Sequence, residues 1–202
     1  YLPPGVMEQL VPYIDLAERL GSFFRQWRGE ILNRLELTYT GKLADYDTRI
    51  LTSAFLVGLL RNVSAEDINL INAMAIAREQ GLSISQVRGG DFEPFGACIR
   101  AQFPEADETA NISGVMLNGE PHLVELDGQR LNCLAQGHML VDLHHDRPGI
   151  VGRMGQILGQ ANVNISFAQM SRSQKGGGAI MILGLDERVP EGLLPEFLQV
   201  PN

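Results

Sequence analysis

The amino-acid sequence predicts an α+β fold in two domains, and three features predict it. The first half contains helix-periodic segments that are followed by a series of short alternating strands. The dipeptides Asn118-Gly119 and Asp127-Gly128 separate these strands, and such dipeptides are strong hairpin signals. After residue 137 the pattern becomes strand, helix, strand, strand, helix. A length of 202 residues is compatible with one or two domains.

The first domain is expected at residues 29–137, after a connecting helix within residues 1–28. Leu10, Ile14 and Phe24 belong to the helical spacing of that first helix. The further elements, in chain order, are a strand with one wet face (34–43), a mostly buried helix (47–61), a helix (69–80), a short strand (82–87) and a meander of antiparallel strands (98–103, 113–117, 122–126 and 131–134).

The second domain is expected at residues 138–202. Met139, Val141 and Leu143 alternate as in a strand, and the apolar residues between 150 and 161 keep one helical face. Two further strands follow, of which residues 179–185 are apolar throughout. A short helix at residues 190–198 is expected to open with Pro190 in its first turn.

Charge and composition exclude several classes of protein. A net charge of -8 argues against a nucleic-acid surface. No apolar run reaches the roughly 18 residues that span a bilayer, and the start YLPPGVMEQL lacks the features of a secretion signal. Without an initiating Met, Tyr1 is expected to be an internal residue of a longer protein or a trimmed end. Cys98 and Cys133 form no CxxC pattern, so we expect free buried thiols of a cytoplasmic protein.

The stretch LHHDRPGIVGRMGQILGQANVNI, residues 143–165, is the candidate site. Asp146 or Arg147 is expected to cap the helix that Pro148 opens, and a helix N-terminus binds carboxylates readily. Gly149 and Gly152 leave room for a small group near that end. An ionised Asp146 suits an ammonium, so the two features together suit a free amino acid.

Two further side chains are expected near this helix end. Asn164 begins the next strand and is expected to reach back toward it, and His144 ends the preceding strand and points across the turn. The competing interpretation is that Asp146 is only a cap and that the histidines are surface residues.

The same stretch lacks the patterns of three other sites. The glycines at 149, 152 and 155 do not form the G-x-G-x-x-G of a dinucleotide loop, and no Walker G-K-[ST] is present. The histidines at 138, 144 and 145 lack the spacing and the fourth ligand of a zinc site. No nucleophile motif or acid–base pair of carboxylates occurs, so neither catalytic nor metal-binding residues are predicted.

HHDRPGIVGRMGQILGQANVNI, with the two strands and the helix that follow it, resembles an ACT domain, a ferredoxin-like βαββαβ module that binds amino acids. The preceding part resembles the intervening, or allosteric substrate-binding, domain of long-form D-3-phosphoglycerate dehydrogenases. The segments that carry this resemblance are VPYIDLAERLGSFF, LELTYTGKLADYDTRILTSAFLVGLL, INLINAMAIAREQG and VELDGQRLNCLAQG. Together the two resemblances cover nearly all of residues 6–200.

The resemblance implies a regulatory part of such an enzyme, with the NAD-binding and catalytic domains upstream in the same chain and no cofactor in this part. It also implies that the ACT domain binds L-serine for feedback inhibition, at an interface of a homo-oligomer. The implied ligands are His144, Asp146, Asn164 and the backbone around Arg147, Pro148, Gly149, Ile150 and Ile165. The family's last ACT strand is expected to be missing, because the sequence stops soon after the second helix.

Some family members bind an anion in the intervening domain. Lys42, Arg49 and Arg130 are the candidates for such an effector site here, and each competes with the interpretation of a solvated charge. Leu134 stands where one branch of the family has an Arg.

Two other functions compete with this one. The β subunit of iron–sulfur L-serine dehydratases pairs similar domains, but its GPSSSHT segment does not occur here. A free-standing ACT sensor is the second alternative, and the helix at residues 7–27, which suits a connection to a larger body, argues against it.

Overall fold

The computed structural model of the chain describes residues 4–29, 33–61, 67–105, 110–174 and 176–200. The chain divides into two compact units, Tyr1–Gly128 and Gln129–Asn202. This division falls before the last strand of the predicted meander, whereas the sequence suggested a turn at residues 136–137. Among the described residues, no helix is both long and apolar enough to cross a membrane.

The first unit contains three α-helices, a 3-10 helix and five strands within its described residues. These are α1 (Pro4–Arg28), β1 (Arg34–Tyr39), η1 (Gly41–Asp45), α2 (Arg49–Leu60), α3 (Ala73–Glu79), β2 (Ser83–Arg88), β3 (Ile99–Gln102), β4 (Asn111–Leu117) and β5 (Glu120–Leu126).

The strands of this unit form a mixed sheet in the order β2-β1-β3-β4-β5, in which only β1 and β2 run parallel. Leu35, Leu37 and Tyr39 alternate with more exposed residues along β1 and are fully buried, which confirms the predicted strand with one wet face. The strand ends earlier than predicted, because Gly41 takes a positive φ of 55° and begins η1.

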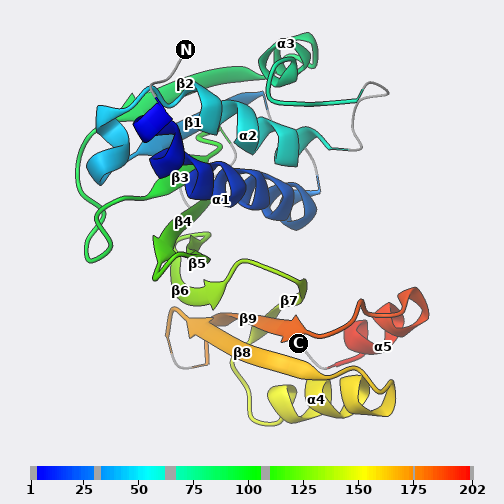
Figure 1. Cartoon of the computed structure of the whole chain (residues 1–202). Helices are drawn as coiled ribbons and strands as arrows, with labels where there is room; N and C mark the ends of the chain where they lie inside the picture. Colours follow the sequence, from blue (N-terminus) through cyan, green and yellow to red (C-terminus); the bar gives the residue numbers. More distant parts are fainter. Residues whose placement is uncertain (1–3, 30–32, 62–66, 106–109, 175, 201–202) are drawn as a thin grey trace. The chain divides into compact units, whose positions relative to one another are not determined.

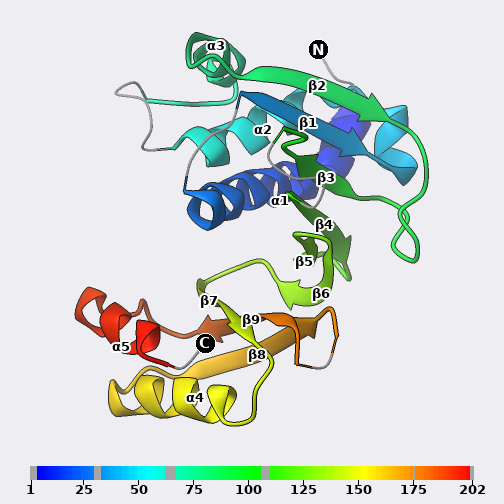
Figure 2. The same ribbon diagram turned by 180° about the vertical axis from the view of Figure 1, so that it is seen from behind.

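Helices α1 and α2 cover one face of this sheet, as the opposite views in Figures 1 and 2 show. The hydroxyl of Tyr39 on β1 lies 2.7 Å from Oγ1 of Thr52 on α2, inside the buried layer. The two helices approach each other at two glycines. A Cβ on Gly21 would lie 2.0 Å from the carbonyl oxygen of Phe55, and one on Gly58 would lie 1.9 Å from that of Glu18.

The C-terminal end of α1 is held by the turn that follows β5. Trp27 Nε1 donates to Asp127 Oδ2 at 2.8 Å, and Arg28 Nη2 donates to Asp127 Oδ1 at 2.5 Å. Asp127 has a left-handed φ of 48°, and its amide donates to the carbonyl of Asn111 at 2.9 Å. One carboxylate therefore joins the end of α1 to the end of β5.

We expect Asp127→Asn to destabilise the first unit by roughly 1–2 kcal/mol, because hydrogen bonds to a charged group are stronger than neutral ones. Asn tolerates the left-handed backbone but has no charge and only one side-chain oxygen for two donors. Urea unfolding measures the effect. Asp15→Asn is the control, because Asp15 pairs with Arg19 on the exposed face of the same helix. Equal midpoints for the two variants would show that the Asp127 contacts contribute nothing.

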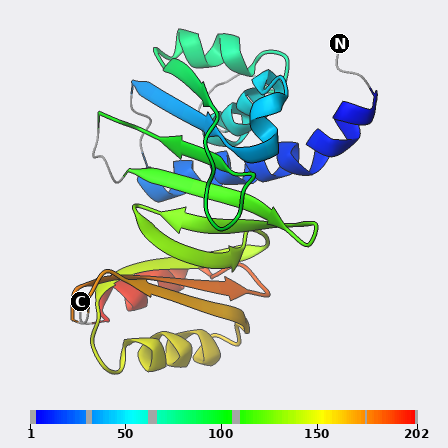
Figure 3. The same ribbon diagram turned by 90° about the vertical axis from the view of Figure 1, so that its left-hand side faces the viewer.

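The second unit begins with β6 (Gln129–Leu134) and continues with a βαββα order, as predicted. The further elements are β7 (His138–His145), α4 (Ile150–Gln160), β8 (Ile165–Arg172), β9 (Gly178–Leu185), η2 (Glu191–Leu193) and α5 (Leu194–Leu198). The antiparallel strands β7-β9-β8 form a sheet of their own, with β9 in the centre (Figure 3). Helices α4 and α5 share one core with β9, to which Met154, Met181 and Phe197 belong.

This arrangement fits the ferredoxin-like fold expected for an ACT domain. The predicted helix at residues 190–198 is in fact a 3-10 turn followed by α5, and Pro190 precedes both. No strand follows α5 up to residue 200, where the described part of the chain stops. The expectation that the last ACT strand is missing therefore falls on residues outside those that the structure describes.

Candidate functional site

The turn between β7 and α4 is built differently from the sequence expectation. α4 begins at Ile150, and its N-cap is Gly149, which has a left-handed φ of 96°. Glycine has no side chain that could cap the helix, so the predicted capping by Asp146 or Arg147 is wrong. The reason is that glycine alone takes this conformation without strain, and the helix starts two residues later than Pro148 suggested. The first amides of α4 have no acceptor within the helix, as in the first turn of any α-helix.

Asp146 is bound instead by the hairpin between β8 and β9. Arg172 Nη1 lies 2.5 Å from Asp146 Oδ2, and the amide of Gly176 donates to the same oxygen at 3.3 Å. The Asp146 amide in turn donates to the carbonyl of Gly177 at 2.8 Å. The hydrogen bond from Arg172 lowers the pKa of the Asp146 carboxyl, and the Gly176 amide adds to this effect. Asp146 is therefore a carboxylate at neutral pH.

His144 is a buried side chain, with 6% of its surface exposed. Its Nδ1 lies 2.8 Å from Asp142 Oδ2, on the same face of β7. The interpretation of surface histidines is therefore wrong for His144, while His145 is exposed. Strand alternation places the two neighbours on opposite faces. Asp142, which the sequence analysis passed over, orients His144, and its signal was its position two residues earlier on the strand.

Asn164 lies at one end of the ACT sheet. Its Nδ2 donates to Asp186 Oδ2 at 2.6 Å, and the Asp186 amide donates to the Asn164 carbonyl at 3.2 Å. The next residue, Ile165, pairs with Leu185, and Leu185 also pairs with His138 at the start of β7. Asn164 therefore belongs to the edge of the sheet where β7 begins.

Asp146 lies at the other end of the same sheet. Arg172 pairs with Ala179, which also pairs with His144 near the end of β7. The two ends are about seven strand residues apart, which corresponds to on the order of 20 Å. The expectation that Asn164 reaches the same helix end is wrong within one chain.

Two of the candidate anion residues, Arg49 and Lys42, have other partners within the first unit. Arg49 Nε lies 2.9 Å from both carboxylate oxygens of Asp47, and Arg88 Nη2 lies 4.0 Å from Asp47 Oδ1. Hydrogen bonding by Arg49 lowers the pKa of Asp47 to about 2. Lys42 Nζ lies 5.5 Å from the centre of the Tyr13 ring. Arg130 belongs to β6 in the second unit. The charge of Arg49 is thus offset by a neighbouring carboxylate.

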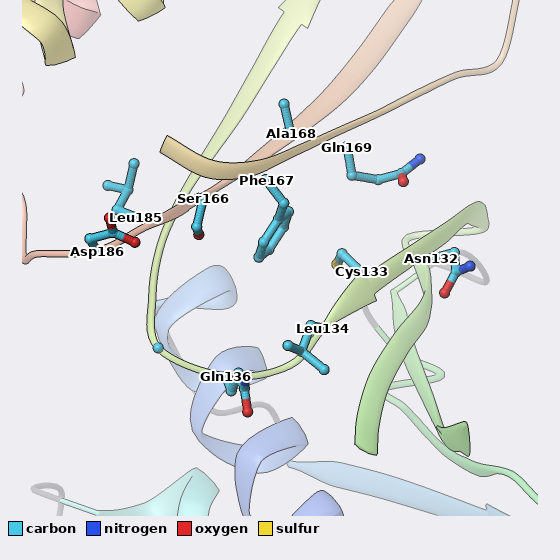
Figure 4. A pocket seen from close by; sticks show the side chains of 11 residues that line it. Asn132, Cys133, Leu134, Gln136, Ser166, Phe167, Ala168, Gln169, Leu185 and Asp186 are labelled. Carbon is cyan, nitrogen blue, oxygen red and sulfur yellow. The ribbon is translucent and has the colours of Figure 1, made fainter. Parts of the chain in front are cut away.

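A pocket of about 620 Å³ lies in the second unit, between β6 with the segment after it and β8. Leu134, Gln136, Phe167 and Asp186 are among its lining residues (Figure 4). Phe167 lies over Gly184, where a Cβ would come within 2.1 Å of its ring. Sequence patterns do not reveal this pocket, because it depends on which strands become neighbours. The glycine inside an apolar strand was its only local signal.

The cysteines and the candidate metal ligands lie among the described residues. Cys98 and Cys133 are free and buried, and burial raises the pKa of both thiols to about 12. No group of three or more His, Cys, Asp or Glu side chains in the described ranges could hold a metal ion.

Comparison with known proteins defines the family of both units. Residues 9–127 match the family model of the D-3-phosphoglycerate dehydrogenase intervening domain. The chain belongs to this family. Residues 138–202 match the ACT domain model. The resemblance found in the sequence is therefore confirmed, and it favours a phosphoglycerate dehydrogenase over a dehydratase subunit.

Relatives from three organisms agree with the family match. Each is named D-3-phosphoglycerate dehydrogenase: the protein of Methanocaldococcus jannaschii is 33% identical over 201 residues, that of Synechocystis sp. 35% over 201 and that of Bacillus subtilis 29% over 198. The alignments cover 96–100% of this chain but only 36–38% of the relatives. The chain thus spans little more than a third of the length of these relatives, and its residues match the intervening and ACT domains.

Proposed function

We propose that this chain is the part of an NAD-dependent D-3-phosphoglycerate dehydrogenase that senses L-serine, the end product of the pathway. In this proposal the ACT domain binds serine and inhibits the enzyme. NAD and the substrate bind to the domains that make up the rest of the enzyme. We expect that enzyme to be cytoplasmic, in keeping with its free cysteines.

The observation that carries this proposal is the pairing of an ionised carboxylate with an uncapped helix start. The amides at the start of α4 suit a carboxylate, and Asp146 suits an ammonium. A free amino acid presents these two groups side by side. His144, fixed by Asp142, adds a polar side chain at the end of the same strand. In this proposal the ligand is held as a signal and is not transformed.

The position of Asn164 supports a site that two ACT domains share. Asn164 and Asp146 lie at opposite ends of one sheet, so a twofold axis that sets two such sheets side by side and antiparallel can bring the Asn164 of one copy to the Asp146 of the other. Each dimer then has two equivalent sites. Serine that bridges the copies favours the arrangement of subunits in which both sites are closed.

Helix α1 is the proposed route of coupling. Asp127 ties its end to the turn that directly precedes the second unit. A change at that turn therefore acts on a helix of 25 residues, and α1 is the element that the sequence analysis expected to connect with the rest of the enzyme.

Titration calorimetry of the purified chain with L-serine tests the proposed function. We expect saturable binding at up to one serine per chain, because a symmetric dimer has two equivalent sites. D-serine serves as the control, since inversion at Cα moves the hydroxymethyl group while both charges remain. If the chain is folded and dimeric but shows no heat of binding with L-serine at millimolar concentration, the assignment is overturned.

A further inference from the structure

The carboxylate proposed to hold the ammonium of the effector already has a cationic partner in the same chain. Arg172 Nη1 lies 2.5 Å from Asp146 Oδ2, across 26 residues of sequence. We propose that Arg172 is an internal counter-ion that competes with the ligand's ammonium for Asp146, and that this competition sets the affinity of the site. The inference rests on the proposed function, because it concerns the regulation of that same site.

The strand pairing explains how Arg172 comes to this position. Arg172 is the last residue of β8, and Ala179 on the central strand separates it from His144 on β7. Its side chain therefore passes the end of β9 to reach Asp146 in the turn after β7. The Gly176 amide binds the same carboxylate oxygen as the guanidinium. The hairpin after β8 thus supplies both a charge and an amide to Asp146.

The exposure of the pair makes an exchange of partners feasible. The Arg172 side chain is 56% exposed and the Asp146 side chain 27%. An ion pair in contact with water gains little net free energy, because solvent screens the attraction and the long side chain loses freedom. An amino acid whose carboxylate is held by the α4 amides can therefore displace the guanidinium with its ammonium. The released Arg172 regains solvent, which limits the cost of the exchange.

A purely structural role for Arg172 makes the opposite prediction. If the ion pair mainly holds the hairpin against the turn, its loss loosens the site and weakens ligand binding. If Arg172 competes, its loss strengthens ligand binding although it does not increase the stability of the fold. The sign of the change in affinity separates the two roles.

The test is calorimetry with L-serine on the wild-type chain, Arg172→Gln and Arg172→Lys. We expect Arg172→Gln to bind serine about two- to fivefold more tightly, the range that corresponds to the coupling of an exposed ion pair. Arg172→Lys keeps the cation and is expected to stay near wild type. Arg78→Gln, on the exposed face of α3, controls for the change in net charge.

The dependence of affinity on salt provides a second readout. In the wild type one cation replaces another at Asp146, so added salt changes the affinity little. In Arg172→Gln the ammonium meets an uncompensated carboxylate, so the affinity falls more steeply between low and high salt.

The outcomes separate this proposal from the proposed function. Wild-type binding with equal or weaker binding by Arg172→Gln would overturn the competition and leave the serine site standing. No binding by any of the variants, with all of them folded, would overturn the serine site and the competition together. Binding by Arg172→Gln alone would support the competition in its strongest form.

Discussion

Gly21→Ala and Gly58→Ala are each expected to destabilise the first unit by about 3 kcal/mol, at the upper end for overpacked cores. The added Cβ would lie 2.0 Å from the Phe55 carbonyl oxygen in the first variant and 1.9 Å from that of Glu18 in the second. Both obstacles are backbone atoms of a packed helix, so no side-chain rotation relieves the clash. α1 and α2 must separate. Urea unfolding followed by circular dichroism measures the loss.

The control for this prediction lies on the same helix. A Cβ on Gly5 meets nothing within 4 Å, so Gly5→Ala adds helix propensity without a clash. We expect it to leave stability unchanged or to raise it by about 0.5–1 kcal/mol. If Gly21→Ala unfolds at the same urea concentration as Gly5→Ala, α1 and α2 do not approach as closely as described above.

Asp146→Ala and Asn164→Ala are each expected to weaken serine binding by about 1.5–3 kcal/mol, the scale of hydrogen bonds to charged groups. A mixture of the two variants is expected to recover part of the binding. The two residues lie at opposite ends of one sheet, so a mixed dimer has one site with both side chains intact and one site with both removed. Calorimetry of the mixture, after exchange of subunits, measures the recovered sites.

The matched control uses the double variant Asp146→Ala/Asn164→Ala mixed with wild type. Its mixed dimers have the same number of altered side chains, but each of the two sites has lost either Asp146 or Asn164. Binding should then come only from the remaining wild-type dimers. If the first mixture recovers no more than its two parents, the ligand does not bridge two copies in this way.

The sequence was sufficient for most elements of the fold, because local patterns decide them. The buried alternation of Leu35, Leu37 and Tyr39 marks β1, and the Asn118-Gly119 turn separates β4 from β5. Helical periodicity likewise identified α4. Its start was misplaced, because Pro148 and Gly149 are both typical of helix starts and only the backbone conformation shows which one ends the turn.

Local sequence patterns did not identify the hydrogen-bonding partners of Asp146 and Asn164. Asp146 was expected to cap the neighbouring helix, but the structure pairs it with Arg172 from another strand. Asn164 was expected beside Asp146, although the order β7-β9-β8 places it at the other end of the sheet. Both errors have one physical cause. A short polar side chain has many possible partners, and the strand order that selects among them depends on the whole domain.

Trp27 is the only tryptophan of the chain, and its indole N–H is bound by Asp127 at the turn before the second unit. Indole emission responds to the polarity and hydrogen bonding of its surroundings. The protein thus contains its own optical probe at the end of α1, beside the turn that leads in sequence to the second unit. Changes at this turn can be followed by intrinsic fluorescence in the unlabelled protein, with or without effector.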